Sequence, residues 1–102
     1  MTTPAERDGH AARSHERLLD ATRRLEALRS HAERQPAERR VELERTLDRL
    51  RGLRNRALAR LEDCRLASGD AWPSMRHQAM AALNELLDGI AEVERRTRRA
   101  AA

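Results

Sequence analysis

The sequence predicts an all-α protein, an antiparallel helical coiled coil, and three observations lead to this class. Ala, Leu, Glu and Arg dominate the 102 residues, Phe and Tyr are absent, and 37% of the residues are charged. This composition is typical of solvent-exposed helices with a narrow apolar stripe, and it disfavours sheets. Small and apolar residues recur at alternating steps of three and four, the heptad pattern of packed helices. One short passage, residues 67–73, interrupts that pattern.

Three heptad-patterned segments are predicted within a single domain over residues 10–98. The first, about 10–35, has the stripe Ala11, Ser14, Leu18, Ala21, Leu25, Leu28 and Ala32. The second, about 37–67, has the stripe Leu43, Leu47, Leu50, Arg54, Ala57, Leu61 and Cys64, widened by Leu53 and Leu58. The third, about 71–98, has the stripe Trp72, Met75, Ala79, Leu83, Leu86, Ile90, Val93 and Thr97. Residues 1–9 have no period and are predicted to be a disordered tail, and residues 99–102 a frayed C-terminus.

The interruption predicts a reversal between two helices. Gly69 can adopt positive φ, Asp70 can cap the following helix, and Pro73 is tolerated in a first helical turn. The chain therefore turns back on itself after Ser68-Gly69.

Trp72 opens the last stripe directly after this turn. It could anchor a partner, because Trp is over-represented in binding hot spots. The favoured alternative is that it plugs the end of the hairpin by packing on Leu61 or Leu66. The candidate turn or partner-anchor residues are Ser68, Gly69, Asp70 and Trp72.

Pro36 leaves two architectures open. A Pro inside a helix removes a backbone donor and clashes with the carbonyl four residues back, at a cost of about 3 kcal/mol. If the chain reverses at Pro36, the three segments form a three-helix bundle. If it only bends there, the first two segments form one long helix kinked at Pro36, and the last helix folds back on it. In that second case the leucines of the first segment have no partner within the chain, and self-association is required.

The middle of the second segment is rich in arginine. Arg45, Arg49, Arg56 and Arg60 share one outer face of the predicted helix and are the candidate phosphate-contacting residues. The alternative is a solvated face whose arginines pair with acids of a neighbouring helix. Ion pairing is favoured, because no aromatic residues lie between the arginines to stack bases. The formal net charge is only +4, so charge alone does not imply nucleic acid.

No catalytic, metal or cofactor site is predicted. The four histidines are not spaced three or four residues from one another, and the single cysteine has no Cys partner. Cys64 excludes an intrachain disulfide and suits a reducing compartment. No segment is apolar enough for a signal core or a membrane span. A cytoplasmic, non-enzymatic protein with no cofactor and no membrane insertion is therefore expected.

Residues 61–72 also carry a resemblance. The run Leu61-Glu62-Asp63-Cys64-Arg65-Leu66, followed by Ala67-Ser68-Gly69-Asp70-Ala71-Trp72 and an amphipathic last segment, resembles a family of small bacterial coiled-coil proteins described as stress-response proteins. The similarity covers roughly residues 25–93. It implies a coiled-coil shape and a stress-related role, with no catalytic residue or cofactor. Pro36 and Pro73 depart from the family's pattern of continuous helix and of an acidic residue after the Trp.

These observations predict a small non-enzymatic coiled-coil protein that self-associates or binds a protein partner, with a stress-related role. The alternative function is nucleic-acid binding through the arginine-rich helix face.

Overall fold

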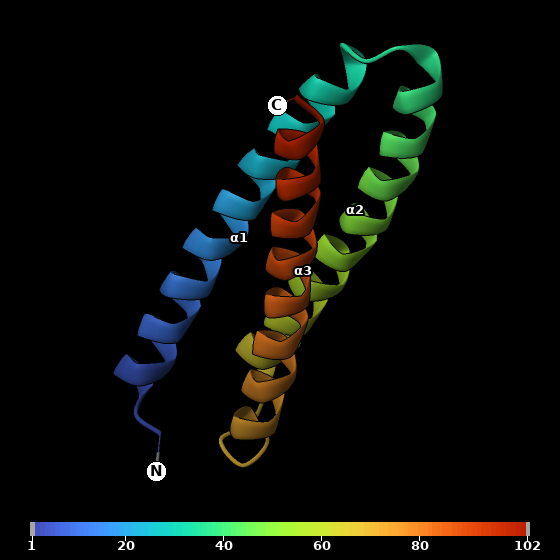
Figure 1. Cartoon of the computed structure of the whole chain (residues 1–102). Helices are drawn as coiled ribbons and strands as arrows, with labels where there is room; N and C mark the ends of the chain where they lie inside the picture. Colours follow the sequence, from blue (N-terminus) through green and yellow to red (C-terminus); the bar gives the residue numbers. More distant parts are fainter. Residues whose placement is uncertain (1, 102) are drawn as a thin grey trace.

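The computed structural model describes residues 2–101. Within this range the chain forms three α-helices of 30 residues each: α1 (Pro4–Glu33), α2 (Ala37–Leu66) and α3 (Trp72–Ala101). Consecutive helices run antiparallel in a rod of 53 × 19 × 16 Å (Figure 1). The start of α1 lies at the same end of the rod as the α2–α3 turn (Figure 1). The predicted all-α, antiparallel helical fold is confirmed.

The chain reverses at Pro36, so the three-helix bundle is correct and the long kinked helix is wrong. The N–H groups of Arg34 and Gln35 donate to the carbonyls of His31 and Ala32, at 3.1 Å each, and close the last turn of α1. Pro36 then has φ −55° and ψ 153°, an extended conformation that cannot continue a helix. The reversal lays the leucines of α1 against the other helices. Each leucine buried in this way contributes about 1.5–3 kcal/mol, which favours the reversal over the exposed long helix.

The prediction of a disordered tail at residues 1–9 is wrong over the described part, because α1 begins at Pro4. Thr3 is the N-cap, and its Oγ1 accepts a hydrogen bond from the Glu6 N–H at 3.1 Å. Pro4 occupies the first turn, where its missing N–H costs nothing, and Glu6 suits the positive end of the helix dipole. This helix start depends on capping residues rather than on apolar periodicity. Met1 lies outside the described residues.

The other helix boundaries differ from the predicted ones by a few residues. The predicted frayed end at 99–102 is wrong for residues 99–101, since α3 continues to Ala101, and residue 102 lies outside the described range. Glu92 accepts hydrogen bonds from Arg95 at 2.6 Å and from Arg96 at 3.3 Å, and such pairs within a helix support its last turns. α1 ends at Glu33 and α2 at Leu66, one or two residues before the predicted ends.

The second reversal lies at residues 67–71, as predicted, but its chemistry is different. None of residues 2–101 has positive φ, so the expected left-handed conformation of Gly69 is wrong. The Ser68 carbonyl accepts hydrogen bonds from the N–H groups of Ala71 and Trp72, at 3.1 and 2.9 Å. The Ala71 N–H also lies 3.4 Å from the Ser68 Oγ. Ser68, rather than Asp70, therefore holds the start of α3.

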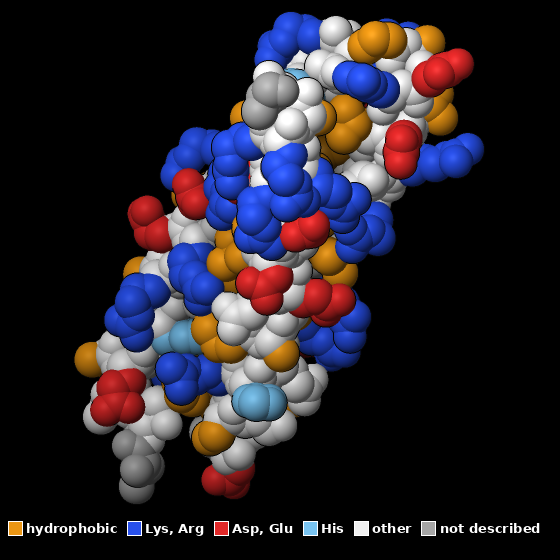
Figure 2. Space-filling view, viewed as in Figure 1, with side chains coloured by type: hydrophobic (Ala, Val, Ile, Leu, Met, Phe, Trp, Pro, Cys, Tyr) orange, Lys and Arg blue, Asp and Glu red, His pale blue; other side chains and the backbone are white. Residues whose placement is uncertain are grey.

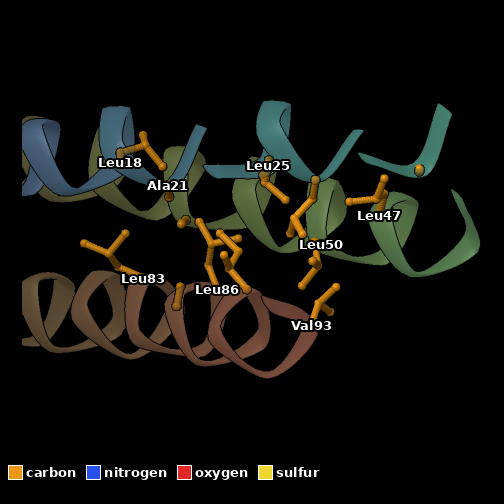
Figure 3. Packing of buried hydrophobic residues seen from close by; sticks show 13 residues of the cluster. Leu18, Ala21, Leu25, Leu47, Leu50, Leu83, Leu86 and Val93 are labelled. Atoms are coloured by element: carbon orange, nitrogen blue, oxygen red, sulfur yellow. The ribbon is translucent and has the colours of Figure 1, made fainter. Parts of the chain in front are cut away.

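A continuous apolar core runs through all three helices (Figure 3). Its most deeply buried large side chains are Leu47, Leu50, Leu83, Leu86 and Ile90. The predicted stripes supply most of the core, together with Ala82 of α3, which belongs to none of them. Further differences concern α1 and α2. In α1 the buried face begins at His10 instead of Ala11, which is exposed, and Leu58 of α2 is 55% exposed instead of widening the core.

α1 packs less extensively on α3 than on α2, and α2 and α3 share the largest contact. In Figure 1, α1 diverges from α3 toward its N-terminus. Three side-chain contacts with hydrogen bonds join them. Arg24 donates to both carboxylate oxygens of Glu94, at 3.0 and 2.5 Å, Arg17 donates to the Asn84 side-chain oxygen at 3.0 Å, and Arg76 donates to the His10 ring at 3.4 Å. The hydrogen bond from Arg24 holds the pKa of Glu94 below its ordinary value. α1 is thus the helix held least tightly to the rest.

Candidate functional site

Trp72 lies at the hairpin end of the bundle and is only 7% exposed. Leu61 packs against the small cluster that Trp72 forms with Cys64 and Ala79, whereas Leu66 is 66% exposed. The guanidinium carbons of Arg7 and Arg76 lie 5.5 and 5.7 Å from the centroid of its ring, within the range of cation–π attraction. This burial supports a structural plug at the end of the hairpin over an exposed partner anchor.

His10 stands edge-on to Trp72, with ring centroids 5.6 Å apart and planes at 87°, and is 5% exposed. Arg76 Nε donates to His10 Nδ1 at 3.4 Å, and His10 Nε2 lies 3.5 Å from the Ser14 Oγ. Because an arginine can only donate, Nδ1 is the acceptor and the neutral ring carries its proton on Nε2. Burial, followed by the charges of Arg76 and Arg13, holds the pKa of His10 below its ordinary value of 6.5.

Arg7 joins the first turn of α1 to the last turn of α2. Its Nη2 donates to the carbonyl of Ala67 at 2.9 Å and to those of Cys64 and Arg65 at 3.3 Å each. Carbonyls in the last turn of a helix have no partner within the helix, and a cation suits the negative end of the helix dipole. Arg7 is therefore a helix cap supplied from another helix.

A groove of about 340 Å³ lies between the first half of α1 and the second half of α2. Its apolar wall is formed by Ala11 and Leu18 of α1 and by Leu58 and Leu61 of α2, and Trp72 lines it as well. Charged and titratable side chains of both signs surround these residues: Arg7, Asp8, His15, Glu62 and Arg65. The groove is an uncovered apolar surface with a mixed rim.

The predicted phosphate-contacting row on α2 has two different halves. Arg56 lies 4.0 Å from Glu85 of α3, and Arg60 lies 3.8 Å from Asp63. Arg45 and Arg49 are exposed and form no ion pair with any residue in the range 2–101. Ion pairing thus accounts for Arg56 and Arg60, whereas Arg45 and Arg49 remain available for another contact.

A second concentration of arginines covers the last turns of α3. Figure 2 shows basic side chains gathered toward the C-terminal part of α3, with acidic side chains among them. Arg95, Arg96 and Arg99 all lie within 4.0 Å of Glu92. The surface is mixed rather than uniformly basic.

Cys64 is 2% exposed, and burial raises the pKa of its thiol. A thiol in that state behaves as a small apolar side chain and not as a nucleophile. Across residues 2–101, no three His, Cys, Asp or Glu side chains are grouped so as to hold a metal ion. Nor does any helix in that range have both the length and the apolar character needed to cross a bilayer.

Three residues of this site, Arg7, His10 and Arg76, are not predicted from the sequence. His10 precedes Ser14 by four residues, so the apolar stripe can be extended back to it as easily as to Ala11. Arg76 follows Trp72 by four and so shares its helix face. Arg7 has no comparable signal, because its partners lie at least 57 residues away.

No protein-family model matches the chain, and no significant match is found among curated proteins or solved structures. Support for a function thus comes from the geometry of residues 2–101.

Proposed function

We propose that this chain is a non-enzymatic helical-bundle protein that pairs with a second copy of itself through the groove between α1 and α2. The observation that carries the proposal is the uncovered apolar surface at that groove. Leu58 is 55% exposed on the α2 side. Leu19 is 42% exposed and follows His15 of the groove by four residues, so it lies on the same face of α1.

The register of α1 and α2 places these two exposed leucines at about the same level along the rod. Further along the same pair of helices, Arg29 and Asp48 line one hollow. Counting back along antiparallel helices from that level places Leu19 opposite Leu58. Exposed leucines on both helices at this level add to the uncovered apolar surface, and exposed apolar patches mark interaction surfaces.

The rim charges favour a second copy as the occupant. Asp8 and Glu62 are acidic, and Arg7 and Arg65 are basic. A two-fold contact places a surface against itself, so it needs a patch that offers both signs of charge. A polyanion would instead meet two carboxylates at this groove.

We expect the proposed dimer to dissociate reversibly, because each monomer is already folded without its partner. The leucines of α1 that would be exposed in a long kinked helix are covered within this chain: Leu18, Leu25 and Leu28. Only the side chains that line the groove would bury further apolar surface on association. A contact of this kind is expected at the weak end of protein–protein affinities.

The chemistry at the groove supports a non-enzymatic role. Ser14 and His10 lie 3.5 Å apart, the closest approach to a nucleophile–base pair at this site. A general base needs a free nitrogen toward the nucleophile, usually with a carboxylate on its other N–H. Here Arg76 donates to Nδ1, so the Nε2 that faces Ser14 carries a proton and cannot accept another.

The proposal also includes a stress-related role. Only the resemblance carried by residues 61–72 supports that part.

Sedimentation equilibrium at pH 7.5 tests the dimer. We expect a concentration-dependent mass between one and two chains, and a shift to monomer for Leu58→Glu. Leu66→Glu is the matched control, since Leu66 is 66% exposed on the same helix but lies outside the groove. A strict monomer up to about 1 mM, corresponding to a binding free energy weaker than about −4 kcal/mol, would contradict the proposal.

A second candidate function is polyanion binding by α2, favoured by the unpaired Arg45 and Arg49. It predicts binding to duplex DNA or RNA that weakens steeply between about 50 and 200 mM salt and that is lost in Arg45→Gln/Arg49→Gln. No gel shift at the lower salt concentration would end this candidate.

A further inference from the structure

We propose that His10 is a proton-operated latch: when its ring gains a second proton, the first turns of α1 separate from the α2–α3 hairpin and the groove loses one wall. The effect on pairing rests on the proposed function. The latch itself depends only on contacts within one chain.

The start of α1 is held to the hairpin by few polar contacts. Arg7 caps α2 and lies over Trp72, and His10 bonds Arg76 and meets the edge of Trp72. The next hydrogen bond from α1 to α3 is the exposed one from Arg17, two turns further on. A change at His10 therefore acts on a short segment that has little else to hold it.

Protonation reverses the contact between His10 and Arg76. In the closed state Nδ1 accepts from the arginine Nε at 3.4 Å. The imidazolium ion carries hydrogen on both nitrogens, so Nδ1–H would point at an arginine N–H. A hydrogen bond becomes a contact between two donors that both carry positive charge.

The groups around His10 do not offset that charge. α1 contributes the cations Arg7 and Arg13 and the hydroxyl of Ser14, and α3 contributes Arg76. α2 contributes the neutral thiol of Cys64, and the nearby Glu62 is already bonded to Arg65 at 2.6 Å. On α1 itself, Glu6 and Asp8 are exposed. No carboxylate in residues 2–101 forms an ion pair with the His10 ring.

The sign of the pH effect follows from the lowered pKa of His10. An opened segment binds the proton near the ordinary value of 6.5, more readily than the closed one. The closed form is therefore fully favoured above pH 6.5 and loses stability as the pH falls from there toward the closed-state pKa. Within that window the opening equilibrium shifts by up to about tenfold per pH unit.

The α1 wall of the groove is the part that opens. His10, Ala11 and Ser14 all belong to the segment beside the latch, and they line the groove together with Trp72. Opening would both remove that wall and hydrate the indole ring. Acid should therefore weaken pairing and expose Trp72 at the same time.

Amide hydrogen exchange and Trp72 fluorescence test the latch directly. Trp72 is the single Trp in a chain with no Tyr, so its emission reports this site alone. Between about pH 7.5 and 5, protection factors over residues 7–14 should fall by up to about tenfold per unit below 6.5, while the core of α3 stays protected. The emission should move to longer wavelength over the same range.

Two substitutions sharpen the test. His10→Gln keeps a neutral polar group and should abolish the pH response of both signals. His77→Gln, at an exposed position of α3 outside the groove, should leave the response intact. Should His10→Gln fail to fold, the NMR titration of His10 in the native chain decides: a pKa at or above 6.5, or unchanged protection over residues 7–14, would overturn the latch.

Sedimentation at the same pH values separates the two proposals. Loss of the dimer at pH 5 in the native chain but not in His10→Gln supports both. A monomer at pH 7.5 whose α1 still opens in acid supports the latch and contradicts the dimer. A dimer with no acid response of Trp72 contradicts the latch alone.

Discussion

Arg7 shows how one side chain can complete a helix that is distant in sequence. Its guanidinium reaches three carbonyls at the end of α2, and it covers one face of Trp72. Side chains that cap a helix are usually its own neighbours, whereas this cap comes from a separate helix. The first turn of α1 therefore belongs to the folded bundle and is not an appended tail.

We expect Arg7→Gln to lower the free energy of unfolding by about 1.5–3 kcal/mol, because hydrogen bonds from a charged donor are lost. Arg23→Gln is the control, since Arg23 is 68% exposed and its nearest acid, Asp20, is 3.9 Å away, so the change should stay within about 0.5 kcal/mol. Urea denaturation followed by circular dichroism measures both. Equal effects of the two substitutions would show that the cap does not contribute.

His10 is a second case in which tertiary contacts set the character of a residue. On sequence it is one of four scattered histidines. In the fold it is buried between an arginine and an indole edge, which fixes both its tautomer and the direction of its pKa shift. A residue of this kind links the protonation of one ring to the position of a helix end.

The packing of α2 on α3 depends on a glycine in the middle of a helix. A Cβ atom added at Gly89 would lie 2.8 Å from Leu50 Cδ2, and Leu50 has no exposed surface. Glycine within a helix costs about 1 kcal/mol relative to alanine, so its presence needs a packing reason. At Gly89 that reason is the close approach of the two helices, and at Gly52 there is none, because an added Cβ would meet nothing within 4 Å.

These two glycines make a matched pair of substitutions. Gly52→Ala should raise the free energy of unfolding by about 0.5–1 kcal/mol through helix propensity. Gly89→Ala gains the same propensity but overpacks a core that cannot yield easily, at a cost of about 1–3 kcal/mol, so its net effect should be destabilising. Thermal denaturation compares them. A Gly89→Ala variant as stable as Gly52→Ala would mean that α2 and α3 separate freely at this level.

The three helices are expected to unfold as one unit at neutral pH. One core cluster passes through all of them, and Leu86 in its centre has no exposed surface (Figure 3). Removing its side chain would leave a cavity within a cluster to which all three helices contribute. This coupling is what makes a rod only 16 to 19 Å thick behave as a single domain.

Leu86→Ala should lower the free energy of unfolding by about 2–5 kcal/mol. Its urea transitions followed by helix content and by Trp72 emission should have the same midpoint at pH 7.5, although Trp72 belongs to a separate cluster at the end of the rod. Leu66→Ala, at a 66% exposed position, should leave the midpoint almost unchanged. Two separate transitions in Leu86→Ala would contradict a single cooperative unit.

Much of the fold could be predicted because the apolar stripes are regular. Leu18, Leu25, Leu83 and Ile90 recur at helical spacing, and each is buried as the pattern predicts. The helix ends were less predictable, since Thr3 and Ser68 act through local hydrogen bonds that leave no periodic trace. The candidate site was least predictable. Trp72, Leu61 and Cys64 could be named from the sequence, whereas Arg7, His10 and Arg76 acquire their roles from contacts between helices.

The amino-acid sequence by itself determined that this protein is helical, where its apolar faces lie, and that the chain turns back after residue 66. These properties follow from backbone preference and spacing, which are local. Only the tertiary structure decided that Pro36 reverses the chain, that Arg7 caps α2, and that His10 is buried beside Trp72 and Arg76. Those outcomes depend on which surfaces meet, and burial of the α1 leucines is the free energy that selects among them.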